Sequence, residues 1–380
     1  MTGFATLADA AAPVRVILVG AGAMGKHWFD VLRASKDVVL VGLVDLDLEL
    51  ANRVKADAGL VELVVGASVS EVARQTDAQA VVNVTVPVAH YAVNTEALFA
   101  GLPVLCEKPI APTVSQALAL AAASEASGQL LMTSQSRRYY RSLAEFRREV
   151  ETLGDVGIVT TEFYRGPRFG GFRESMEQPL LVDMAIHAFD VSRYLLGSEP
   201  VSVYCETFNP SWSWYQGDAA AIATFEFANG VRYLFNGSWC SDGLETSWNG
   251  NWRVSASGGT ARWDGETSPT VVRVEAATDS PDIELDAPAG EEIAGSLAEF
   301  IEAIRTGHTP SGAVHSNILS LAMVEAAVRS ADRGNKIALA DMLEDAYASA
   351  LTAEKDARTL AILQGWGSAS SGLSLGVAVG

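Results

Sequence analysis

The chain has 380 residues, of which 49% are hydrophobic and 19% charged, a globular composition with ample material for two domains. Its 27 lysines and arginines stand against 46 acidic residues, which gives a formal net charge of −19. A surface this acidic would repel phosphate backbones and anionic lipid, which argues against nucleic-acid and membrane partners.

The first third of the sequence alternates short apolar runs with amphipathic segments of helical length. Strands are expected over 14–20, 38–45, 61–66, 79–86, 102–107 and 130–134, and helices over 23–35, 47–58, 68–74, 88–100 and 113–127. Such alternation is typical of a parallel, doubly wound sheet, whose ligands bind at the carboxyl ends of the strands. We therefore predict an α/β domain over residues 13–134.

A glycine-rich run, Gly20-Ala21-Gly22-Ala23-Met24-Gly25, follows the first strand and opens the first helix. In this strand–turn–helix setting a G-x-G-x-x-G run predicts dinucleotide binding. Gly20 permits the tight turn, Gly22 lets the backbone approach a pyrophosphate, and Gly25 lets helix and strand pack closely. The diphosphate would lie at the N-terminus of the helix that starts near Ala23. The competing interpretation is a glycine-rich turn without a ligand.

Asp45 ends the second expected strand. It lies about 20 residues after the third glycine, where a carboxylate can accept hydrogen bonds from both ribose hydroxyls. The residues that follow are Leu46, Asp47 and Leu48, so no arginine or lysine is close by. A 2′-phosphate would meet two carboxylates and no cation, and we therefore predict NAD in preference to NADP.

The fifth expected strand closes on Glu107-Lys108-Pro109. A lysine at this strand end would lie over the crevice where the nicotinamide end of the cofactor binds. Its ammonium could hydrogen-bond a substrate hydroxyl and stabilise the alkoxide that forms as hydride leaves. Partial burial would also let it share a proton. The alternative is a solvated lysine at the end of a strand.

Beyond about residue 134, long strand-like runs replace the alternation. They cover 156–166, 200–208, 218–228, 231–240, 250–257, 260–264 and 270–276, with helices expected over 139–153 and 181–196. Ala228-Asn229-Gly230 predicts a hairpin between two of these runs. Short turns between neighbouring strands favour a mostly antiparallel sheet, so the fold class is α/β followed by α+β, with the second domain over 135–345.

The C-terminal part of the sequence returns to helical patterns. Helices are expected over 292–306, 314–333 and 341–363, with a short strand over 336–339. A Gly-Ser-Ala-Ser-Ser-Gly run and an apolar end follow. We treat residues 346–380 as a C-terminal helix and tail.

A second group of chemically active residues lies in the helix expected over 181–196. The i, i+4, i+7 spacing puts Asp183, His187 and Asp190 on one helix face. A carboxylate one turn before an imidazole can orient it as a general base. A capping aspartate beside a surface histidine, and a metal site, are the alternatives. Because no cysteine or second histidine is near, we predict no metal. The preceding Arg168–Phe172 segment predicts a flexible loop that can close over a ligand.

Aromatic residues crowd the second domain, since five of the eight tryptophans lie within 212–252. Indole rings can stack on the apolar face of a sugar ring while their N–H groups meet hydroxyls. Trp212 and Trp214 are too closely spaced for simple strand alternation, so carbohydrate stacking or an aromatic dimer contact competes with plain core packing.

In order and spacing these motifs resemble one family. They are Gly20–Gly25, Thr85-Val86-Pro87, Glu107-Lys108-Pro109 and Asp183-x-x-x-His187-x-x-Asp190. The family is Gfo/Idh/MocA, of glucose–fructose oxidoreductases and inositol dehydrogenases, and the resemblance covers roughly residues 13–340. It implies an N-terminal Rossmann domain that binds NAD and a C-terminal domain whose large, mostly antiparallel sheet serves substrate and oligomer contacts. The implied reaction is reversible oxidation of a sugar or cyclitol hydroxyl by hydride transfer to nicotinamide.

Carried onto this chain, the resemblance implies a catalytic set of Lys108, Asp183 and His187. His187 would accept the hydroxyl proton, Lys108 would polarise the oxygen and share the proton, and Asp183 would anchor the substrate or the imidazole. The implied substrate contacts are Arg138 or Tyr139, Asp183 and His187, and the aromatic stacking argument adds Trp212 and Trp214. The implied cofactor contacts are Gly20, Gly22, Ala23, Met24, Gly25, Asp45, Thr85, Pro87, His90, Glu107 and Lys108.

Two other functions stay open at this point. One is a non-catalytic, NAD-binding regulator that responds to sugars on the same fold. The other is a glycoside oxidoreductase whose tightly bound NAD is recycled by a second sugar. In either case the expected ligand is a small carbohydrate or cyclitol, and a second copy would cover one face of the second sheet in a homodimer or homotetramer.

The expected compartment is the cytoplasm. Cys106, Cys205 and Cys240 are far apart and lack C-x-x-C spacing, so they predict neither a disulfide framework nor zinc. The first dozen residues carry no basic segment or long apolar stretch of the kind that a secretion signal needs. No apolar run approaches the ~18 residues of a membrane span.

Overall fold

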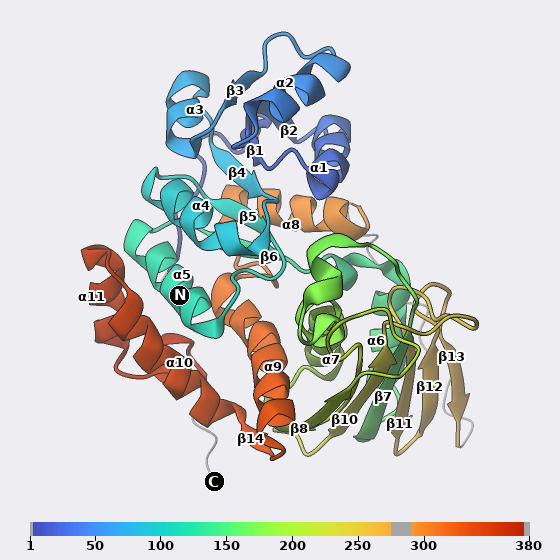
Figure 1. Ribbon diagram of the computed structural model, residues 1–380. Coiled ribbons are helices and arrows are strands. Elements are labelled where there is room, and N and C mark those ends of the chain that lie inside the picture. Colours follow the sequence, from blue (N-terminus) through green and yellow to red (C-terminus); the bar gives the residue numbers. More distant parts are fainter. Residues whose placement is uncertain (1–2, 275–289, 376–380) are drawn as a thin grey trace. The chain divides into compact units, whose positions relative to one another are not determined.

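The computed structural model describes residues 3–274 and 290–375 (Figure 1). These residues form two compact units. The first unit contains residues up to Ser136, together with two later segments, 290–318 and 344–375; the second contains 137–274 and 319–343. The chain therefore returns twice to its first unit, and two of the changes of unit fall within α9 (Val314–Arg333) and α10 (Leu339–Ala353).

In the described residues, the sheet of the first unit has six strands, all parallel. They are β1 (Val14–Val19), β2 (Val38–Val44), β3 (Val64–Gly66), β4 (Ala80–Asn83), β5 (Val104–Glu107) and β6 (Leu131–Ser134), in the order β3-β2-β1-β4-β5-β6. The strands β4, β5 and β6 are short and buried along their whole length, as a parallel sheet covered on both faces requires. The strand order reverses between β1 and β4, the place where doubly wound sheets bind ligands.

Helices that link these strands mostly begin with a capping side chain. They are α1 (Ala23–Ala34), α2 (Leu48–Asp57), α3 (Val69–Thr76), α4 (Pro87–Phe99) and α5 (Val114–Ser127). Asp47, Ser68 and Thr113 each accept a hydrogen bond from an N–H in the first turn of α2, α3 and α5. At α1 the cap position is Gly22, and none of the described side chains caps this helix. Its first N–H groups therefore stay available to a ligand.

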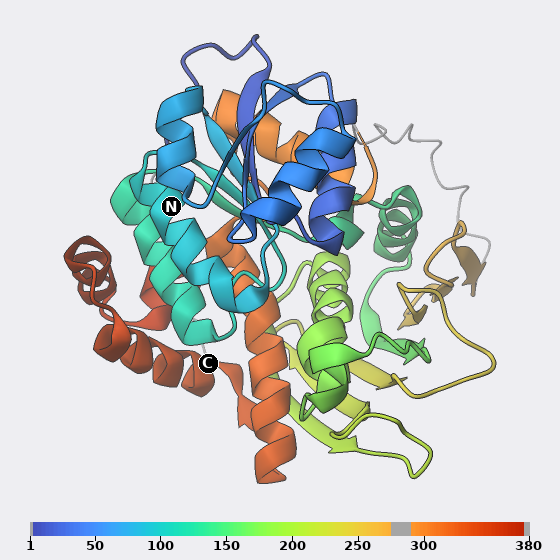
Figure 2. The same ribbon diagram turned by 45° about the horizontal axis from the view of Figure 1, so that its top comes forward.

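C-terminal helices complete the first unit. Here α8 (Glu292–Thr306) packs against α1 and β6, and α11 (Ala357–Trp366) packs along α5, as Figures 1 and 2 both show. The predicted single helix over 341–363 is wrong, because α10 ends at Ala353 and α11 begins after Asp356. The Asp356 side chain accepts from the N–H groups of Arg358 and Thr359, which starts a new helix and ends the old one.

A short helix, α12 (Ala369–Gly372), follows α11 and is capped by the side chain of Ser368. The expected tail is therefore partly helical. Its last five residues, 376–380, lie outside the described residues.

The sheet of the second unit has eight strands in the described residues, in the order β13-β12-β11-β7-β10-β9-β8-β14. The strands are β7 (Val156–Tyr164), β8 (Pro200–Phe208), β9 (Ala220–Phe227), β10 (Arg232–Ser238), β11 (Asn251–Ala256), β12 (Gly259–Trp263), β13 (Thr270–Arg273) and β14 (Ile337–Ala338). Of these described pairings only β7 with β10 is parallel, which confirms the predicted α/β plus mostly antiparallel α+β fold. The predicted hairpin joins β9 to β10, with Gly230 at φ 84°. Of the strand expected over 270–276, residues 275 and 276 lie outside the described residues.

One face of this sheet is covered by helices, among them α6 (Arg141–Glu151) and α7 (Ile186–Leu196) (Figure 1). Phe189 of α7 meets inward-facing rings of the sheet, with centroid distances of 4.8 Å to Phe225 and 5.4 Å to Phe235. The opposite face carries alternate residues that are exposed, including Tyr204 and Ile222. This alternation is the period-two pattern of a sheet with one buried face.

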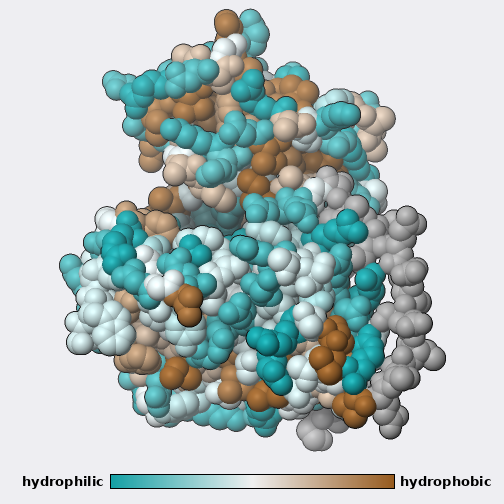
Figure 3. All heavy atoms as spheres, turned by 90° about the vertical axis from the view of Figure 1, so that its right-hand side faces the viewer, coloured by the Kyte–Doolittle hydropathy of each residue, from teal (hydrophilic) through white to brown (hydrophobic). Residues whose placement is uncertain are grey.

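Among the described residues, no helix combines the length and the hydropathy needed to cross a bilayer. In the lower part of Figure 3, which shows the second unit, hydrophobic side chains form small separate spots among hydrophilic ones. Scattered apolar residues of this kind are normal on a protein surface.

Candidate nucleotide site and active site

The Gly20–Gly25 turn joins β1 to α1 at the switch point of the first sheet. Gly20 has a φ of 106°, and a Cβ there would lie 2.9 Å from the carbonyl oxygen of Val84. At Gly25 a Cβ would collide with the carbonyl oxygen of Gly20, so glycine alone permits this close packing of helix and strand. A Cβ on Gly22 would meet none of the described atoms within 4 Å, so space is open beside its backbone.

The N-terminus of α1 has the chemistry of an anion site. In the described structure no side chain caps it, and its first turn holds no acidic residue. Uncapped N–H groups and the positive end of the helix dipole both favour a diphosphate. Ala23 and Met24, two of the predicted cofactor contacts, form the first turn, and Met24 is exposed.

Asp45 lies beside this turn, at the end of β2. Its Oδ2 accepts a hydrogen bond from the Ala21 N–H at 2.7 Å, and its Oδ1 accepts one from the Asp47 N–H at 2.8 Å. The carboxylate is thereby fixed at the edge of the glycine turn. Leu46, which follows, is 90% exposed. The residues that follow Asp45 in the sequence, Leu46, Asp47 and Leu48, include no lysine or arginine.

Residues after β4 form the next part of the predicted cofactor site. The Asn83 side-chain oxygen accepts from both the N–H and the hydroxyl of Thr85, at 3.1 and 2.8 Å, and Pro87 is the first residue of α4. His90 is fully buried, with its Nδ1 2.7 Å from the Pro109 oxygen and its Nε2 2.9 Å from the Thr85 oxygen. His90 thus ties the end of β4 to the segment after β5.

Burial lowers the pKa of His90, with a smaller contribution in the same direction from the charge of Lys108. The two carbonyl oxygens favour the charged ring, but their effect is smaller than that of burial. We therefore treat His90 as neutral near pH 7, with one ring nitrogen donating to a carbonyl oxygen.

The Glu107-Lys108-Pro109 triplet lies at the end of β5, and its Lys108–Pro109 peptide bond is cis. The buried indole of Trp28 donates a hydrogen bond to Glu107 Oε1 at 2.8 Å, and the Lys108 N–H donates to Glu107 Oε2 at 3.2 Å. Trp28 was missed by sequence reasoning, because an indole on α1 has the pattern of an ordinary core residue and its partner is far away in the sequence.

In the second unit, the helix expected over 181–196 begins differently from the prediction. Residues Leu180–Ala185 form a π-helical turn, and α7 follows from Ile186. Such turns are rare in proteins, and many of those known lie at functional sites. Because Asp183 lies in the π-helical turn, the i, i+4, i+7 spacing of a regular α-helix does not describe its direction. Asp183 accepts a hydrogen bond from Arg173 Nε at 2.6 Å, a contact that the sequence did not reveal.

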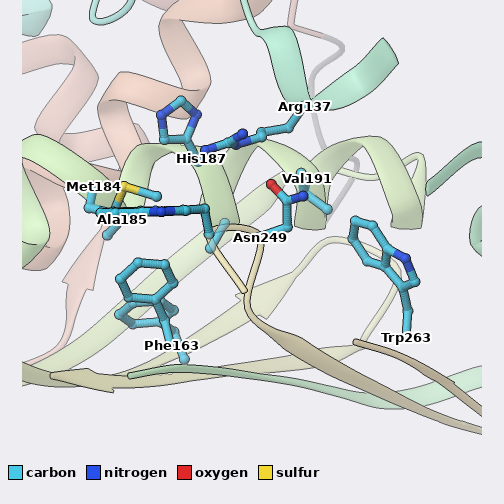
Figure 4. Close-up of a pocket in the computed structure, with 11 residues that line it drawn as sticks. Arg137, Phe163, Met184, Ala185, His187, Val191, Asn249 and Trp263 are labelled. Atoms are coloured by element: carbon cyan, nitrogen blue, oxygen red, sulfur yellow. The ribbon is translucent and has the colours of Figure 1, made fainter. Parts of the chain in front are cut away.

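His187 lies in the first turn of α7, above a small and mostly apolar pocket (Figure 4). Phe163 and Trp263 reach from the strands towards the helix, and Met184 lines the same pocket. The polar side chains at its rim are Arg137 and Asn249. The imidazole is therefore almost buried, against a hydrophobic floor.

Arg138, predicted as a substrate contact, lies in the 3₁₀ helix Ser136–Tyr139 together with Tyr139. Its guanidinium forms a two-point ion pair with Asp190. The Ser320 hydroxyl also donates to Asp190, at 2.6 Å. Arg138 thereby holds α7 through Asp190, whose side chain is directed into the interior.

The predicted aromatic contacts lie between β8 and β9. Trp212 is 71% exposed, and its indole N–H donates to the Cys240 carbonyl at 3.1 Å. Trp214 stacks with the Arg168 guanidinium, 3.9 Å from the ring centroid. For Trp239 and Trp252, which are buried, the plain-core interpretation holds.

Each unit therefore gathers its own predicted residues. The first places all its predicted cofactor residues at or just beyond the carboxyl ends of β1, β2, β4 and β5. The second places Asp183 and His187 on consecutive helical turns. In the part of the chain that the structure describes, no group of histidine, cysteine, aspartate or glutamate side chains is arranged to hold a metal ion.

Comparison with known proteins matches both units to one family. Residues 14–135 match the oxidoreductase family with an NAD-binding Rossmann fold, GFO_IDH_MocA, and residues 144–262 match the GFO/IDH/MocA C-terminal domain. The chain is 26% identical to the uncharacterized protein y4oX of Sinorhizobium fredii over 348 residues, which cover 87% of this chain and 97% of that protein.

Two further similarities are limited, one in the length that it covers and the other in sequence identity. Inositol 2-dehydrogenase 4 of Saccharopolyspora erythraea is 34% identical over 194 residues, 50% of this chain and 56% of that enzyme, so the match spans about half of either protein. The crystal structure of an oxidoreductase from Agrobacterium radiobacter, in complex with NAD+, L-tartaric acid and magnesium, has a TM-score of 0.76 at 19% identity and covers 87% of this chain and 100% of that one. This second likeness shows a shared fold.

Proposed function

Because the chain belongs to the GFO/IDH/MocA family of NAD-binding oxidoreductases, we propose that it oxidises a hydroxyl group of a sugar or cyclitol. One observation carries this proposal. The chain has the Gly20–Gly25 turn and Asp45 expected of a nucleotide site, and it also has Lys108 and His187, two groups suited to proton transfer, which a protein that only senses NAD does not need.

NAD is the proposed cofactor, in preference to NADP. The Asp45 carboxylate is oriented by the N–H groups of Ala21 and Asp47, and Leu46 is the next residue. This arrangement suits ribose hydroxyls, and it would repel a 2′-phosphate. Bound NAD would supply the hydride acceptor.

The protein's own part in the reaction is proton transfer and charge stabilisation. His187 accepts the proton of the reacting hydroxyl, which is the role of a general base. The proposed part of Lys108 is charge stabilisation, since its ammonium can hydrogen-bond a substrate hydroxyl oxygen and stabilise negative charge that develops there. Asp183 accepts a hydrogen bond from a neighbouring substrate hydroxyl. The tie from Trp28 to Glu107 holds the end of β5, which carries Lys108.

A ring-shaped polyol is the proposed substrate class. The relative from Saccharopolyspora erythraea is named for inositol, and the second unit carries the exposed Trp212 together with Trp214 beside its Arg168 partner. Aromatic rings of this kind stack on the C–H face of a sugar or cyclitol. We further propose that the exposed sheet face with Tyr204 and Ile222 is the contact surface between copies of the chain in a homodimer or homotetramer. The three free, buried cysteines suit a reducing compartment, the cytoplasm.

A substrate panel tests the proposal. Purified protein is mixed with NAD, or with NADP as control, and with myo-inositol, scyllo-inositol, D-glucose or D-xylose, while NADH absorbance is followed. We expect reduction of NAD with at least one compound and slower reduction of NADP. Intact NAD binding without any reduction would favour a sugar-responsive regulator. Release of nicotinamide nucleotide on denaturation of the purified protein would favour a tightly held, recycled cofactor.

A further inference from the structure

Arg173 and Asp183 form an ion pair in the second unit, one helical turn before His187. Arg173 Nε lies 2.6 Å from Asp183 Oδ2, and the two side chains are 35% and 21% exposed. The pair is therefore open to a ligand and is also partly shielded from water, which strengthens its hydrogen bonds. Such charge-assisted bonds are short and strong.

The chain builds this contact with a tight turn. Gly170 and Gly171 both have a φ of 68°, which brings the short 3₁₀ helix Gly171–Ser175 back towards the π-helical turn that carries Asp183. The Arg173 guanidinium lies 5.2 Å from the ring centroid of Phe169 and 4.9 Å from that of Phe172. Two rings and one carboxylate thus fix the guanidinium.

Phe169 is itself held in place. Its ring packs edge-on against Trp239 at 5.9 Å and stacks near Trp248 at 6.3 Å. The support under Arg173 is therefore continuous with the aromatic core of the second unit. A flexible surface arginine has no such support.

The Arg173 guanidinium has further N–H donors besides Nε. A guanidinium carries several N–H groups in a fixed plane, and the bond to Asp183 uses only Nε. Among the described residues, none accepts a hydrogen bond from Nη1 or Nη2 of Arg173. A carboxylate acceptor next to guanidinium donors complements two adjacent hydroxyls, because one hydroxyl donates to the carboxylate and the oxygen of the other accepts from the guanidinium.

Taking Asp183 as the substrate contact of the proposed function, we propose that Arg173 is a specificity-determining residue that binds, together with Asp183, a vicinal diol of the substrate. Arg173 donates to one hydroxyl oxygen and Asp183 accepts from its neighbour. The site thereby selects ring polyols with adjacent hydroxyls over alcohols whose hydroxyls are isolated. Loss of one charge-assisted hydrogen bond weakens binding by roughly tenfold to a hundredfold.

Arg147, on α6 of the same unit, provides a matched control. Its Nε also pairs with a carboxylate, that of Glu151 at 2.9 Å, and the two side chains are 36% and 58% exposed. Its guanidinium also lies near an aromatic ring, 4.5 Å from the centroid of Tyr194. Since neither Arg147 nor Glu151 is among the predicted substrate contacts, replacement of Arg147 should leave diol binding unchanged.

The test measures binding to the whole chain with NAD present, for wild type, Arg173→Gln, Arg173→Lys and Arg147→Gln. The probes are myo-inositol and D-glucose, which have adjacent hydroxyls, and cyclohexane-1,4-diol, which has none. We expect wild type to bind a vicinal probe at least about tenfold more tightly than cyclohexane-1,4-diol. Arg173→Gln should lose that preference, Arg173→Lys should keep part of it, and Arg147→Gln should match wild type. Thermal unfolding of each variant checks that the fold is retained.

Several results would overturn the proposal: wild type that binds no vicinal probe, Arg173→Gln that binds like wild type, or Arg147→Gln that loses as much affinity as Arg173→Gln. Binding does not depend on hydride transfer, so the two proposals can fail separately. A protein that binds diols through Arg173 but reduces no NAD would remove the proposed function alone. If the Arg173 variants turn over vicinal substrates as wild type does, this inference alone is overturned.

Discussion

Arg138 and Asp190 form a two-point ion pair in the interior of the second unit. Arg138 Nε lies 2.7 Å from Asp190 Oδ2 and Nη2 lies 2.7 Å from Oδ1, while the two side chains are only 7% and 1% exposed. Ser320 adds a third hydrogen bond to the same carboxylate. The pair anchors α7 one turn beyond His187, so it fixes the helix that carries the proposed general base.

Replacing Asp190 by Asn should destabilise the protein strongly, because it removes the buried charge that pairs with Arg138 and accepts from Ser320. Removing one partner of a buried pair costs about 3–5 kcal/mol. Asp242→Asn, at the exposed pair with Arg168, should cost at most about 1 kcal/mol. Urea unfolding of the two variants checks this expectation. Equal losses from the two substitutions would show that the buried pair contributes no more than a surface one.

Asp45→Ala should weaken NAD binding by roughly tenfold to a hundredfold, since two hydrogen bonds from ribose to a charged group are lost. The double change Asp45→Ser with Leu46→Arg should shift the preference towards NADP by removing a carboxylate and adding a cation. Dissociation constants for NAD and NADP, measured for each variant, check both effects. Affinity for NAD within about twofold of wild type in Asp45→Ala would rule out the ribose contact.

Trp28→Phe removes the indole N–H that binds the buried carboxylate of Glu107. The smaller phenyl ring leaves a cavity, which by itself lowers the free energy of unfolding. We expect loss of the hydrogen bond to lower it by about 1–3 kcal/mol more. Trp239→Phe is the matched control, because Trp239 is equally buried and its indole nitrogen has no partner among the described residues. The difference between the two variants in urea unfolding isolates the hydrogen bond. No difference would mean that the bond contributes nothing net.

His90 should make stability depend on pH. Burial lowers its pKa below the ordinary value of 6.5, so the unfolded chain binds a proton before the folded protein does. The contribution of neutral His90 to the free energy of unfolding is complete above pH 6.5. It is lost as the pH falls towards the lowered pKa of His90 in the folded protein. Melting temperatures between pH 7.5 and 5.5 should therefore fall more steeply for wild type than for His90→Gln. Melting temperatures that fall equally steeply with pH in wild type and His90→Gln would contradict the lowered pKa of His90.

Much of the first unit could be predicted from the sequence, since its strands are short apolar runs and its glycine turn has a fixed spacing. The α9 helix also has its predicted bounds, because an uninterrupted helical pattern fills residues 314–333. The break between α10 and α11 was missed. The helical pattern continues through it, and only the capping bonds of Asp356 mark the boundary.

The parts of the candidate site that could not be predicted depend on contacts between distant residues. The Trp28–Glu107 bond joins a helix to a strand end that comes much later in the chain, and no local pattern marks it. Arg173 reaches Asp183 because two glycines with positive φ turn the chain back. The π-helical turn under Asp183 has no periodicity distinct from a helix, so the sequence predicted a regular one.

The most direct measurement compares turnover and NAD affinity in Lys108→Ala, His187→Ala and a control, His308→Ala, whose histidine is exposed. Removing a general acid or base costs about 10²–10⁴-fold in rate. We expect Lys108→Ala and His187→Ala each to lower kcat by that order with little change in the NAD dissociation constant, while His308→Ala matches wild type. Unchanged kcat in both Lys108→Ala and His187→Ala would contradict the proposed proton transfer.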